Sequence, residues 1–245
     1  MRIISVVPSL TELLFDLGLQ NEIVGITRFC IHPKQKNNKV TKVGGTKSLK
    51  LDRIFQLEPD IIIANKEENA QEDIEYLKKH FDVLLTDIFT LEQALESILE
   101  IGRRTNVIFK AKLLVEEIRM EFKHLKPFSK SKNKVAYFIW DNPMMISGRN
   151  TFINNILEIL GFENLDTNVA SRYPELTNQK IIEGKPDFLF LSSEPFPFKE
   201  KQKLEFESRF PKMQVVLVDG EMFSWYGSRL KLAPKYFNQL IQELT

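Results

Sequence analysis

Residues 106–126 are the stretch that most restricts the fold of this chain of 245 residues. Apolar residues recur there every three or four positions, as in an amphipathic helix; they are Ala111, Leu114, Val115, Ile118, Phe122 and Leu125. Thr105 or Asn106 can cap its start, and Pro127 stops it. At 1.5 Å per residue the helix is roughly 30 Å long, about the width of a small domain. Two interpretations follow: a bridge between two lobes, or an ordinary packed helix in one α/β domain.

Short apolar runs alternate with amphipathic segments on both sides of this stretch. Predicted strands cover residues 2–7, 22–26, 61–64 and 82–86 before it, and 135–140, 188–192 and 214–218 after it. The sequence SLTE at residues 9–12 has the form of a capping box that opens a helix. Strands that alternate with helices are typical of a parallel sheet covered by helices.

A weak internal repeat suggests that this alternation of strands and helices occurs twice. Residues 51–63 and 178–190 each contain a short helix, a Pro-Asp turn and a buried strand, although Pro-Asp is also simply a common turn. We therefore predict an α/β protein of two Rossmann-like lobes, each a mostly parallel sheet flanked by helices. The N-terminal lobe covers residues 1–105, the bridging helix residues 106–127, and the C-terminal lobe residues 128–245. Such lobes place a cleft at the carboxyl ends of their strands.

Composition excludes several classes of function. The chain has 34 Lys and Arg against 33 Asp and Glu, so its net charge of +1 does not favour a nucleic-acid partner. No run of 18 apolar residues predicts a membrane span, and the single Cys30 cannot form an internal disulfide. Pro8 breaks the first apolar run too early for a signal peptide. The chain as written is expected in the cytoplasm, although an exported protein given a new start methionine would read the same.

The usual signatures of enzymes are missing from the sequence. It contains no G-x-S-x-G elbow, no P-loop and no G-x-G-x-x-G after a strand. Cys30 and His32 are a candidate nucleophile and base, or two metal ligands, but the only other histidines are His80 and His124 on predicted helices. We therefore interpret Cys30 and His32 as surface or loop residues and predict a protein that is not an enzyme.

Aromatic and methionine side chains gather just after the predicted strands. They are Phe29, Trp140, Met144, Met145, Tyr173, Phe223, Trp225 and Tyr226. Loops at the carboxyl ends of strands are where α/β proteins bind ligands, and such side chains suit a large, flat, partly apolar ligand. Arg28 and Arg229 are candidates to bind its acidic groups. About half of the aromatic set is expected to pack in the core instead.

Several segments, spread over essentially the whole chain, have a familiar order and spacing. They are VPSLTEL at residues 7–13, the loop at 26–33, VGG at 43–45, the segment 51–64 ending LEPDIIIA, NPMMISG at 142–148 and MFSWYGSR at 222–229. Together they resemble the periplasmic binding proteins of the cobalamin and iron-siderophore type, a superfamily of metal receptors with a helical backbone. The resemblance implies two α/β lobes bridged by one long helix. It also implies a receptor that delivers a metal chelate to an ABC importer.

The resemblance also implies roles for particular residues. Cobalamin-binding members place aromatic contacts at the positions of Phe29, Thr46, Asn65, Met145 and Tyr173 here, and only the first and last keep a ring. Trp225 and Tyr226 in the late loop would compensate. The family docks its permease through one carboxylate per lobe. Those positions read Asp52 and Gln179, with Glu175 or Glu183 near the second.

We therefore predict a monomeric solute-binding protein for a cobalt- or iron-containing chelate, such as a corrinoid, a siderophore or a haem-like ligand, with no covalently bound cofactor. The expected ligand contacts are Arg28, Phe29, Thr46, Asn65, Trp140, Met145, Tyr173, Trp225, Tyr226 and Arg229, and the expected docking residues for an ABC permease are Asp52 and Glu175. The alternatives are a cytosolic chelate-binding or sensing protein and a chelatase-like, metal-dependent enzyme. Three histidines disfavour a receptor for a bare metal ion. The resemblance favours the periplasm, whereas the missing signal peptide favours the cytoplasm.

Overall fold

The computed structural model describes residues 1–34, 39–128, 133–165 and 171–244. The chain divides into two compact units. The first contains Met1–Ile88, Glu92–Met120 and Tyr226–Lys231, and the second contains Phe89–Leu91, Glu121–Trp225 and Leu232–Thr245. Each unit is built on a mostly parallel sheet flanked by helices, so the predicted α/β fold class is confirmed.

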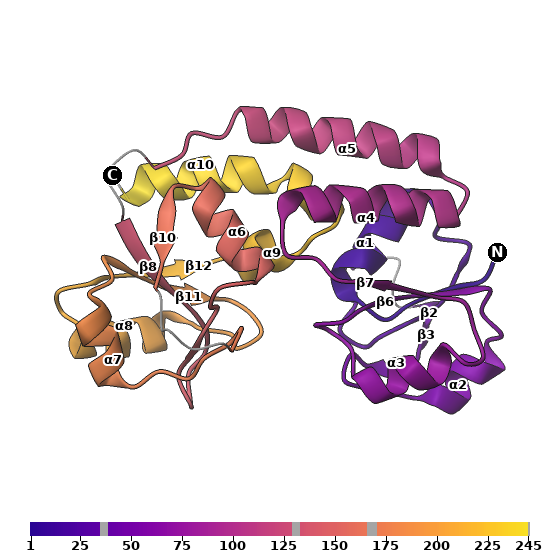
Figure 1. The fold of residues 1–245 in the computed structure, drawn as a ribbon, viewed down its shortest axis with the longest axis horizontal. Helices are drawn as coiled ribbons and strands as arrows, with labels where there is room; N and C mark the ends of the chain where they lie inside the picture. Colours follow the sequence, from indigo (N-terminus) through magenta and orange to yellow (C-terminus); the bar gives the residue numbers. More distant parts are fainter. Residues whose placement is uncertain (35–38, 129–132, 166–170, 245) are drawn as a thin grey trace. The chain divides into compact units, whose positions relative to one another are not determined.

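The first unit has a parallel sheet with the strand order β3-β2-β1-β6-β7. Its strands are β1 (Ile3–Ser5), β2 (Ile23–Ile26), β3 (Thr41–Lys42), β6 (Ile61–Asn65) and β7 (Val83–Thr86). Every residue of β1 and β6 is buried, since helices cover both faces of the sheet. Figure 1 shows α1 (Pro8–Asp16) and α4 (Leu91–Arg104) on one face, and α2 (Leu51–Gln56) and α3 (Gln71–Leu77) on the other.

The second unit has a parallel sheet with the order β10-β8-β11-β12, and the short β9 pairs antiparallel with β8. Its strands are β8 (Asn133–Trp140), β9 (Met145–Ile146), β10 (Phe162–Asn164), β11 (Phe188–Ser192) and β12 (Gln214–Val218). In Figure 1, one face carries α7 and α8 and the other carries α6, α9 and α10. These helices are α6 (Phe152–Ile159), α7 (Asn178–Gly184), α8 (Glu200–Arg209), α9 (Gly220–Ser224) and α10 (Ala233–Leu244).

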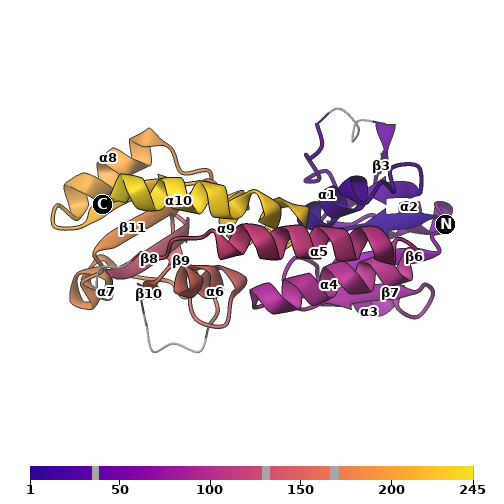
Figure 2. The same ribbon diagram turned by 90° about the horizontal axis from the view of Figure 1, so that it is seen from above.

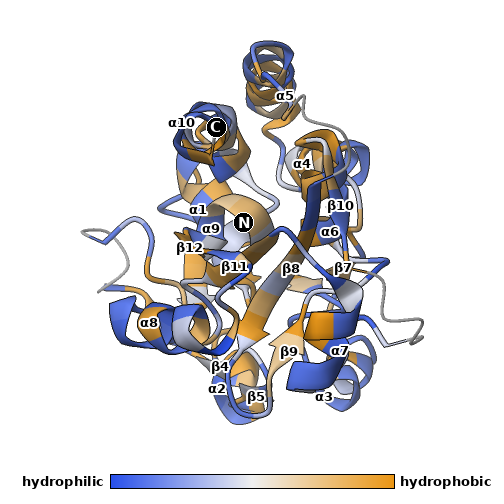
Figure 3. Cartoon of the chain, turned by 90° about the vertical axis from the view of Figure 1, so that its left-hand side faces the viewer, coloured by the Kyte–Doolittle hydropathy of each residue, from blue (hydrophilic) through white to orange (hydrophobic). Residues whose placement is uncertain are grey.

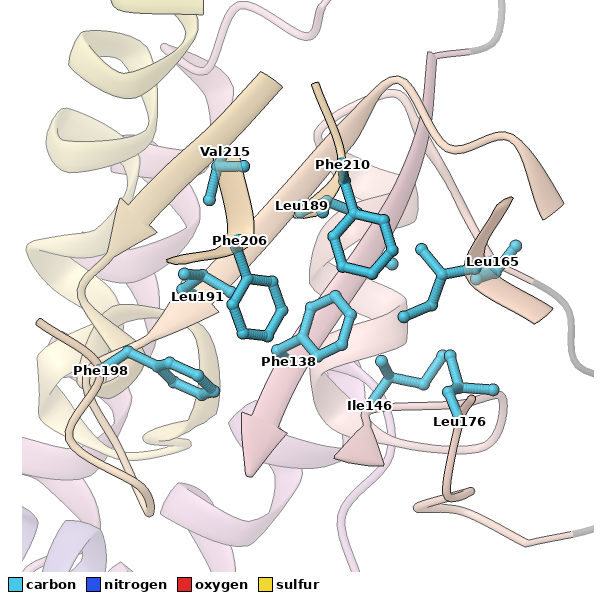
Figure 4. Close-up of a cluster of buried hydrophobic side chains, with 12 residues drawn as sticks. Phe138, Ile146, Leu165, Leu176, Leu189, Leu191, Phe198, Phe206, Phe210 and Val215 are labelled. Carbon is cyan, nitrogen blue, oxygen red and sulfur yellow. The ribbon is translucent and has the colours of Figure 1, made fainter. Parts of the chain in front are cut away.

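Aromatic rings fill the core between the second sheet and its helices α7 and α8. In Figure 4 the rings of Phe138, Phe206 and Phe210 point toward one another and toward the aliphatic side chains of the sheet. The rings of Phe138 and Phe206 meet edge to face at 5.1 Å. Helix α8 is mainly hydrophilic in Figure 3, and Phe206 is its only buried residue. One aromatic anchor therefore holds this helix on the sheet, because the rest of its surface is polar.

Helix α5 (Ile108–Lys123) is shorter than the 21 residues predicted. Asn106 adopts a left-handed φ of 60°, which separates α5 from α4, so neither Thr105 nor Asn106 opens the helix as expected. The two helices lie side by side (Figure 2), and a Cβ atom on Gly102 would collide with that of Ala111. Residues of α5 up to Met120 belong to the first unit, and its last residues, from Glu121, belong to the second unit.

Several local predictions were wrong. Helix α1 begins at Pro8 with Val7 as its cap and no side-chain capping bond, so SLTE is not a capping box. Residues 44–45 begin a hairpin of β4 (Gly44–Gly45) and β5 (Ser48–Leu49), and β9, β10 and α9 lie in segments for which no strand or helix was predicted. In the described part of the chain, no helix is long and apolar enough to cross a membrane.

Candidate functional site

The loop after β2 presents an exposed aromatic ring beside a cation. The Phe29 ring is 48% exposed, and the Arg28 guanidinium lies 4.9 Å from its centre. The backbone N–H of Arg28 donates to the carbonyl of Gly44 at 2.9 Å, which fixes the loop on the β4–β5 hairpin. A Cβ atom on Gly45 would sit 3.2 Å from the Phe29 ring, so glycine leaves room for the ring there. Among the residues described, Arg28 forms no ion pair, and its charge remains available to a ligand.

The tip of the β4–β5 hairpin is tied to the loop after β6. Lys47 donates to the carbonyls of Glu67 and Asn69, at 2.5 and 3.3 Å. The Asn69 amide donates to the carbonyls of Thr46 and Val6, at 3.1 and 3.0 Å. Thr46 is half-buried at this tip. These hydrogen bonds therefore fix the β4–β5 hairpin, which lies next to Phe29, to the loop after β6.

Asn65, at the end of β6, serves the structure of its loop. It is 1% exposed, accepts from the backbone N–H of Glu67 at 2.8 Å, and donates to the Thr86 hydroxyl at 3.0 Å. Its side chain offers no surface to a ligand in this structure, so it is not a ligand contact as predicted. Asparagine at this position fits an internal role, since it supplies both a donor and an acceptor.

Arg229 forms a largely buried ion pair with Glu12 within the first unit. Its guanidinium donates two hydrogen bonds to the carboxylate of Glu12, at 2.9 and 2.5 Å, and the two side chains are 10% and 15% exposed. Burial raises the pKa of the Glu12 carboxyl, and the charge of Arg229 opposes that rise. Tyr226 lies in the same returning segment and is 3% exposed. Arg229 and Tyr226 were predicted as ligand contacts like Arg28 and Phe29, but both are largely buried in the structure.

The carboxyl ends of β8 and β11 in the second unit carry a second aromatic pair. Trp140 is 40% exposed, and its ring meets that of Phe196 edge to face at 5.7 Å. The Trp140 indole N–H donates to the carbonyl of Asn142 at 3.2 Å. Sequence analysis missed Phe196, although it stands four residues after β11 in a proline-rich stretch. Its position just after a predicted strand, the criterion that selected Trp140, would have identified Phe196 as a candidate ligand contact.

Met145 and the segment around Tyr173 meet at the same end of the second unit. Met145 pairs with Trp140 between β9 and β8, and also bridges to Glu175. The Arg172 carbonyl accepts from the N–H of Gly148 at 2.8 Å. Tyr173 and Met145 are half-buried. The structure thus gathers three predicted contacts, Trp140, Met145 and Tyr173, on neighbouring backbone segments.

Trp225 is a buried residue of the second unit, and its indole is hydrogen-bonded to the carboxylate of Glu194. It is 6% exposed, and its indole N–H donates to the Glu194 carboxylate at 2.8 Å; the hydroxyl of Ser224 donates to the same oxygen at 2.6 Å. Burial raises the pKa of the Glu194 carboxyl, and the nearby acids Glu221 and Asp219 raise it further. Trp225 therefore anchors the loop from β12 onto the loop from β11.

Replacing Glu194 with glutamine is expected to stabilise the protein at neutral and alkaline pH. The amide oxygen still accepts from Ser224 and Trp225, while the penalty for a buried charge disappears. Because the folded-state pKa of Glu194 is raised, that penalty acts above this pKa and is lost as the pH falls through it. Thermal unfolding of E194Q and wild type should therefore converge in acid; a gain that persists there would contradict the assignment.

No metal centre is found among the described residues, where no three His, Cys, Asp or Glu side chains gather as a metal site needs. Cys30 is 2% exposed and lies 3.1 and 3.2 Å from the hydroxyls of Thr11 and Thr27. Burial raises the pKa of its thiol, which disfavours the reactive thiolate. A core role for Cys30 follows.

The predicted docking residues lie on the surfaces of the two units. Asp52 is exposed in the first turn of α2. Glu175 is exposed in the second unit, and Gln179 on α7 donates to Glu183 at 2.8 Å. Both units therefore offer a carboxylate close to the positions that the resemblance indicated.

Comparisons with known proteins agree with this architecture. A family model described as periplasmic binding protein matches residues 3–212. A vitamin B12-binding protein of Vibrio parahaemolyticus is 26% identical over 194 residues, which cover 78% of this chain and 70% of the relative. An uncharacterized ABC transporter substrate-binding lipoprotein of Bacillus subtilis is 29% identical over 197 residues, covering 76% and 62%. A periplasmic haem-binding protein from Pseudomonas aeruginosa shares the fold, with a TM-score of 0.82 at 18% identity over 98% of this chain and 92% of that chain.

Proposed function

Because the chain belongs to the periplasmic binding protein family, we propose that it captures a metal-bearing chelate for an ABC importer. The chelate contains cobalt or iron and is a corrinoid, a haem-like macrocycle or a siderophore. The relatives named for vitamin B12 and haem support this class of ligand, and the relative named as an ABC substrate-binding lipoprotein supports the transport role. Members of this family are substrate-binding proteins of transporters, so no catalytic step is proposed.

The observation that carries the proposal is the exposed Phe29 ring beneath the Arg28 guanidinium. Half-exposed rings on loops at strand ends suit a flat, partly apolar ligand, because stacking removes apolar area from water without ordering a flexible side chain. Burial of ~300 Å² of ligand at about 25 cal/mol per Å² corresponds to roughly 7 kcal/mol before ordering costs. Trp140 and Phe196 offer a second surface of the same kind in the other unit.

A thermal-shift screen tests the ligand class directly. The purified chain is heated with cyanocobalamin, haemin and ferric siderophores, and a bound ligand raises the unfolding midpoint by mass action. We expect one chelate class to raise the midpoint in a concentration-dependent way. If no chelate raises the unfolding midpoint at a concentration a hundredfold above a micromolar dissociation constant, the proposed function is wrong.

Replacing Phe29 with alanine is expected to weaken chelate binding about tenfold or more, which is about 1.4 kcal/mol. The substitution removes a ring that is half exposed, so the free energy of unfolding should fall by no more than about 1 kcal/mol. Calorimetric titration with the chelate found in the screen measures the effect. Phe109→Ala is the matched control, because that ring is 73% exposed on α5. Equal affinities of F29A and wild type would remove Phe29 from the site.

Charge reversal at Asp52 is expected to reduce delivery of the ligand without reducing its capture. An exposed carboxylate on α2 would pair with a cation of the permease, and such a contact acts on association rather than on ligand affinity. Uptake by reconstituted importer should fall at least fivefold for D52K, with calorimetric affinity unchanged. Glu96→Lys on exposed α4 surface is the control. Normal uptake with D52K would exclude Asp52 from docking.

A further inference from the structure

Helix α5 carries three large apolar side chains on the side opposite its buried face. Phe109 is 73% exposed, Leu113 is 53% exposed and Met120 is 54% exposed. At about 100° per residue these three positions fall within about 40° of one another, and each lies about 140–180° from the fully buried Ile118. Large apolar side chains that line up on one exposed face indicate an interaction surface, whereas scattered ones do not.

The spacing along this face is that of a coiled-coil seam. Phe109, Leu113, Glu116 and Met120 follow one another at intervals of four, three and four residues. The a and d positions of a coiled coil recur with the same alternation, and their side chains pack against a second helix with that repeat. Glu116 is the exposed polar member of the seam. The face therefore fits a helical partner.

The charges beside the seam decide which helix fits it. Lys112 is exposed and forms no hydrogen bond or ion pair with the described residues. Arg119 forms exposed ion pairs with Glu92 and Glu116, at 3.3 and 3.4 Å. The remaining charged neighbours have partners within the chain; they are Lys110, which donates to the carbonyl of Leu17, and Glu117, which pairs with Lys231. A fitting partner therefore supplies apolar side chains opposite the seam and a carboxylate opposite Lys112.

A second copy of α5 in the antiparallel direction supplies both. When Leu113 of one copy lies opposite Glu116 of the other, Phe109 lies opposite Met120, because both pairs are centred on the same midpoint of the helix. Lys112 then lies beside Glu116 of the second copy, and twofold symmetry forms this pair twice. A thioether against a ring is a favourable contact. A parallel pair would instead place Glu116 opposite itself, as like charges.

We propose that the protein forms a weak homodimer through antiparallel pairing of α5 along this seam, a dimer in place of the monomer predicted from the sequence. The net charge of +1 does not oppose association, and the acids Glu116 and Glu117 disfavour an anionic membrane as the partner. Three apolar side chains per copy bury less than the roughly 1,200 Å² of a stable interface, so we expect a dissociation constant of about 10–100 μM. At the few micromolar of a calorimetric cell the chain is then mainly monomeric.

Sedimentation velocity between about 5 and 500 μM tests the dimer, because its population follows mass action. We expect the sedimentation coefficient of the wild type to rise with concentration. Leu113→Glu should raise the dissociation constant about tenfold or more, since it places a charge in the apolar seam. Leu204→Glu is the matched control, because Leu204 is a leucine on α8 that is 59% exposed. A wild type that stays monomeric throughout, or equal effects of the two variants, would overturn the inference while the proposed function stands.

A charge swap tests the antiparallel direction. Lys112→Glu and Glu116→Lys each place like charges at both symmetric contacts, so each should raise the dissociation constant about fivefold. The double variant K112E/E116K restores opposite charges and should return to within about twofold of the wild type. Both positions are exposed, so folding should be preserved. In a parallel pair position 116 would still face its own charge in the double variant, so a double variant no better than the single ones would overturn the inference.

Discussion

Replacing Arg229 with methionine is expected to lower the free energy of unfolding by about 3–5 kcal/mol. Arg229 and Glu12 form a two-bond ion pair in which both side chains are at most 15% exposed. Removing the guanidinium leaves a carboxylate that burial already disfavours. Because the pKa of Glu12 then rises further, the loss should be greatest at neutral and alkaline pH and should shrink in acid, where Glu12 is protonated.

Chemical denaturation of three proteins measures this effect. The double variant E12Q/R229M should lose less than R229M alone, since no buried charge is then left without its partner. Arg103→Met is the control, because its ion pair with Glu100 is solvated at 56% and 38% exposure and is expected to contribute less than about 1 kcal/mol. A loss in R229M no greater than that in the Arg103 variant would show that the buried pair is not a major source of stability.

Replacing Trp225 with alanine is expected to cost about 3–5 kcal/mol of stability, as for other large aromatic residues removed from a core. The residue is 6% exposed, and its indole N–H satisfies the Glu194 carboxylate. Thermal and urea unfolding should show the loss. Ligand binding would weaken only to the extent that the loops after β11 and β12 rearrange.

Trp140 provides the matched comparison, because it is a tryptophan of the same unit that is 40% exposed. Trp140→Ala is expected to cost less than about 1 kcal/mol in stability and to weaken chelate binding about tenfold, the reverse of the pattern expected for Trp225. If the two variants changed stability equally, the contrast between a core tryptophan and a ligand-facing one would be wrong.

The elements that the sequence predicted well are those with a local cause. Strand β6 is a run of apolar residues after a Pro-Asp turn, and it is buried between β1 and β7. The short helix predicted at the start of residues 178–190 is α7 (Asn178–Gly184), and Thr177 caps it by accepting from the N–H of Lys180. Each signal involves residues within a few positions of one another.

The errors fell where a distant partner decided the outcome. SLTE satisfied the local rule for a capping box, but the structure uses Glu12 to bind Arg229, 217 residues away in the chain. The short strand β10 carries little signal of its own and exists because β8, much earlier in the chain, supplies its hydrogen bonds. The short β9 is an exception, because it pairs with the nearby end of β8. Tertiary pairing thus overrode or created local structure that no window of sequence contained.

The amino-acid sequence alone determined the alternation of strands and helices and the placing of aromatic residues just after strands, because apolar periodicity and turn chemistry act between near neighbours in the chain. The tertiary structure decided which of those rings and cations reach the surface. Phe29 and Trp225 look alike in the sequence, yet one is half exposed and the other buried. Exposure depends on the side chains that pack around a residue, and most of those come from distant parts of the chain.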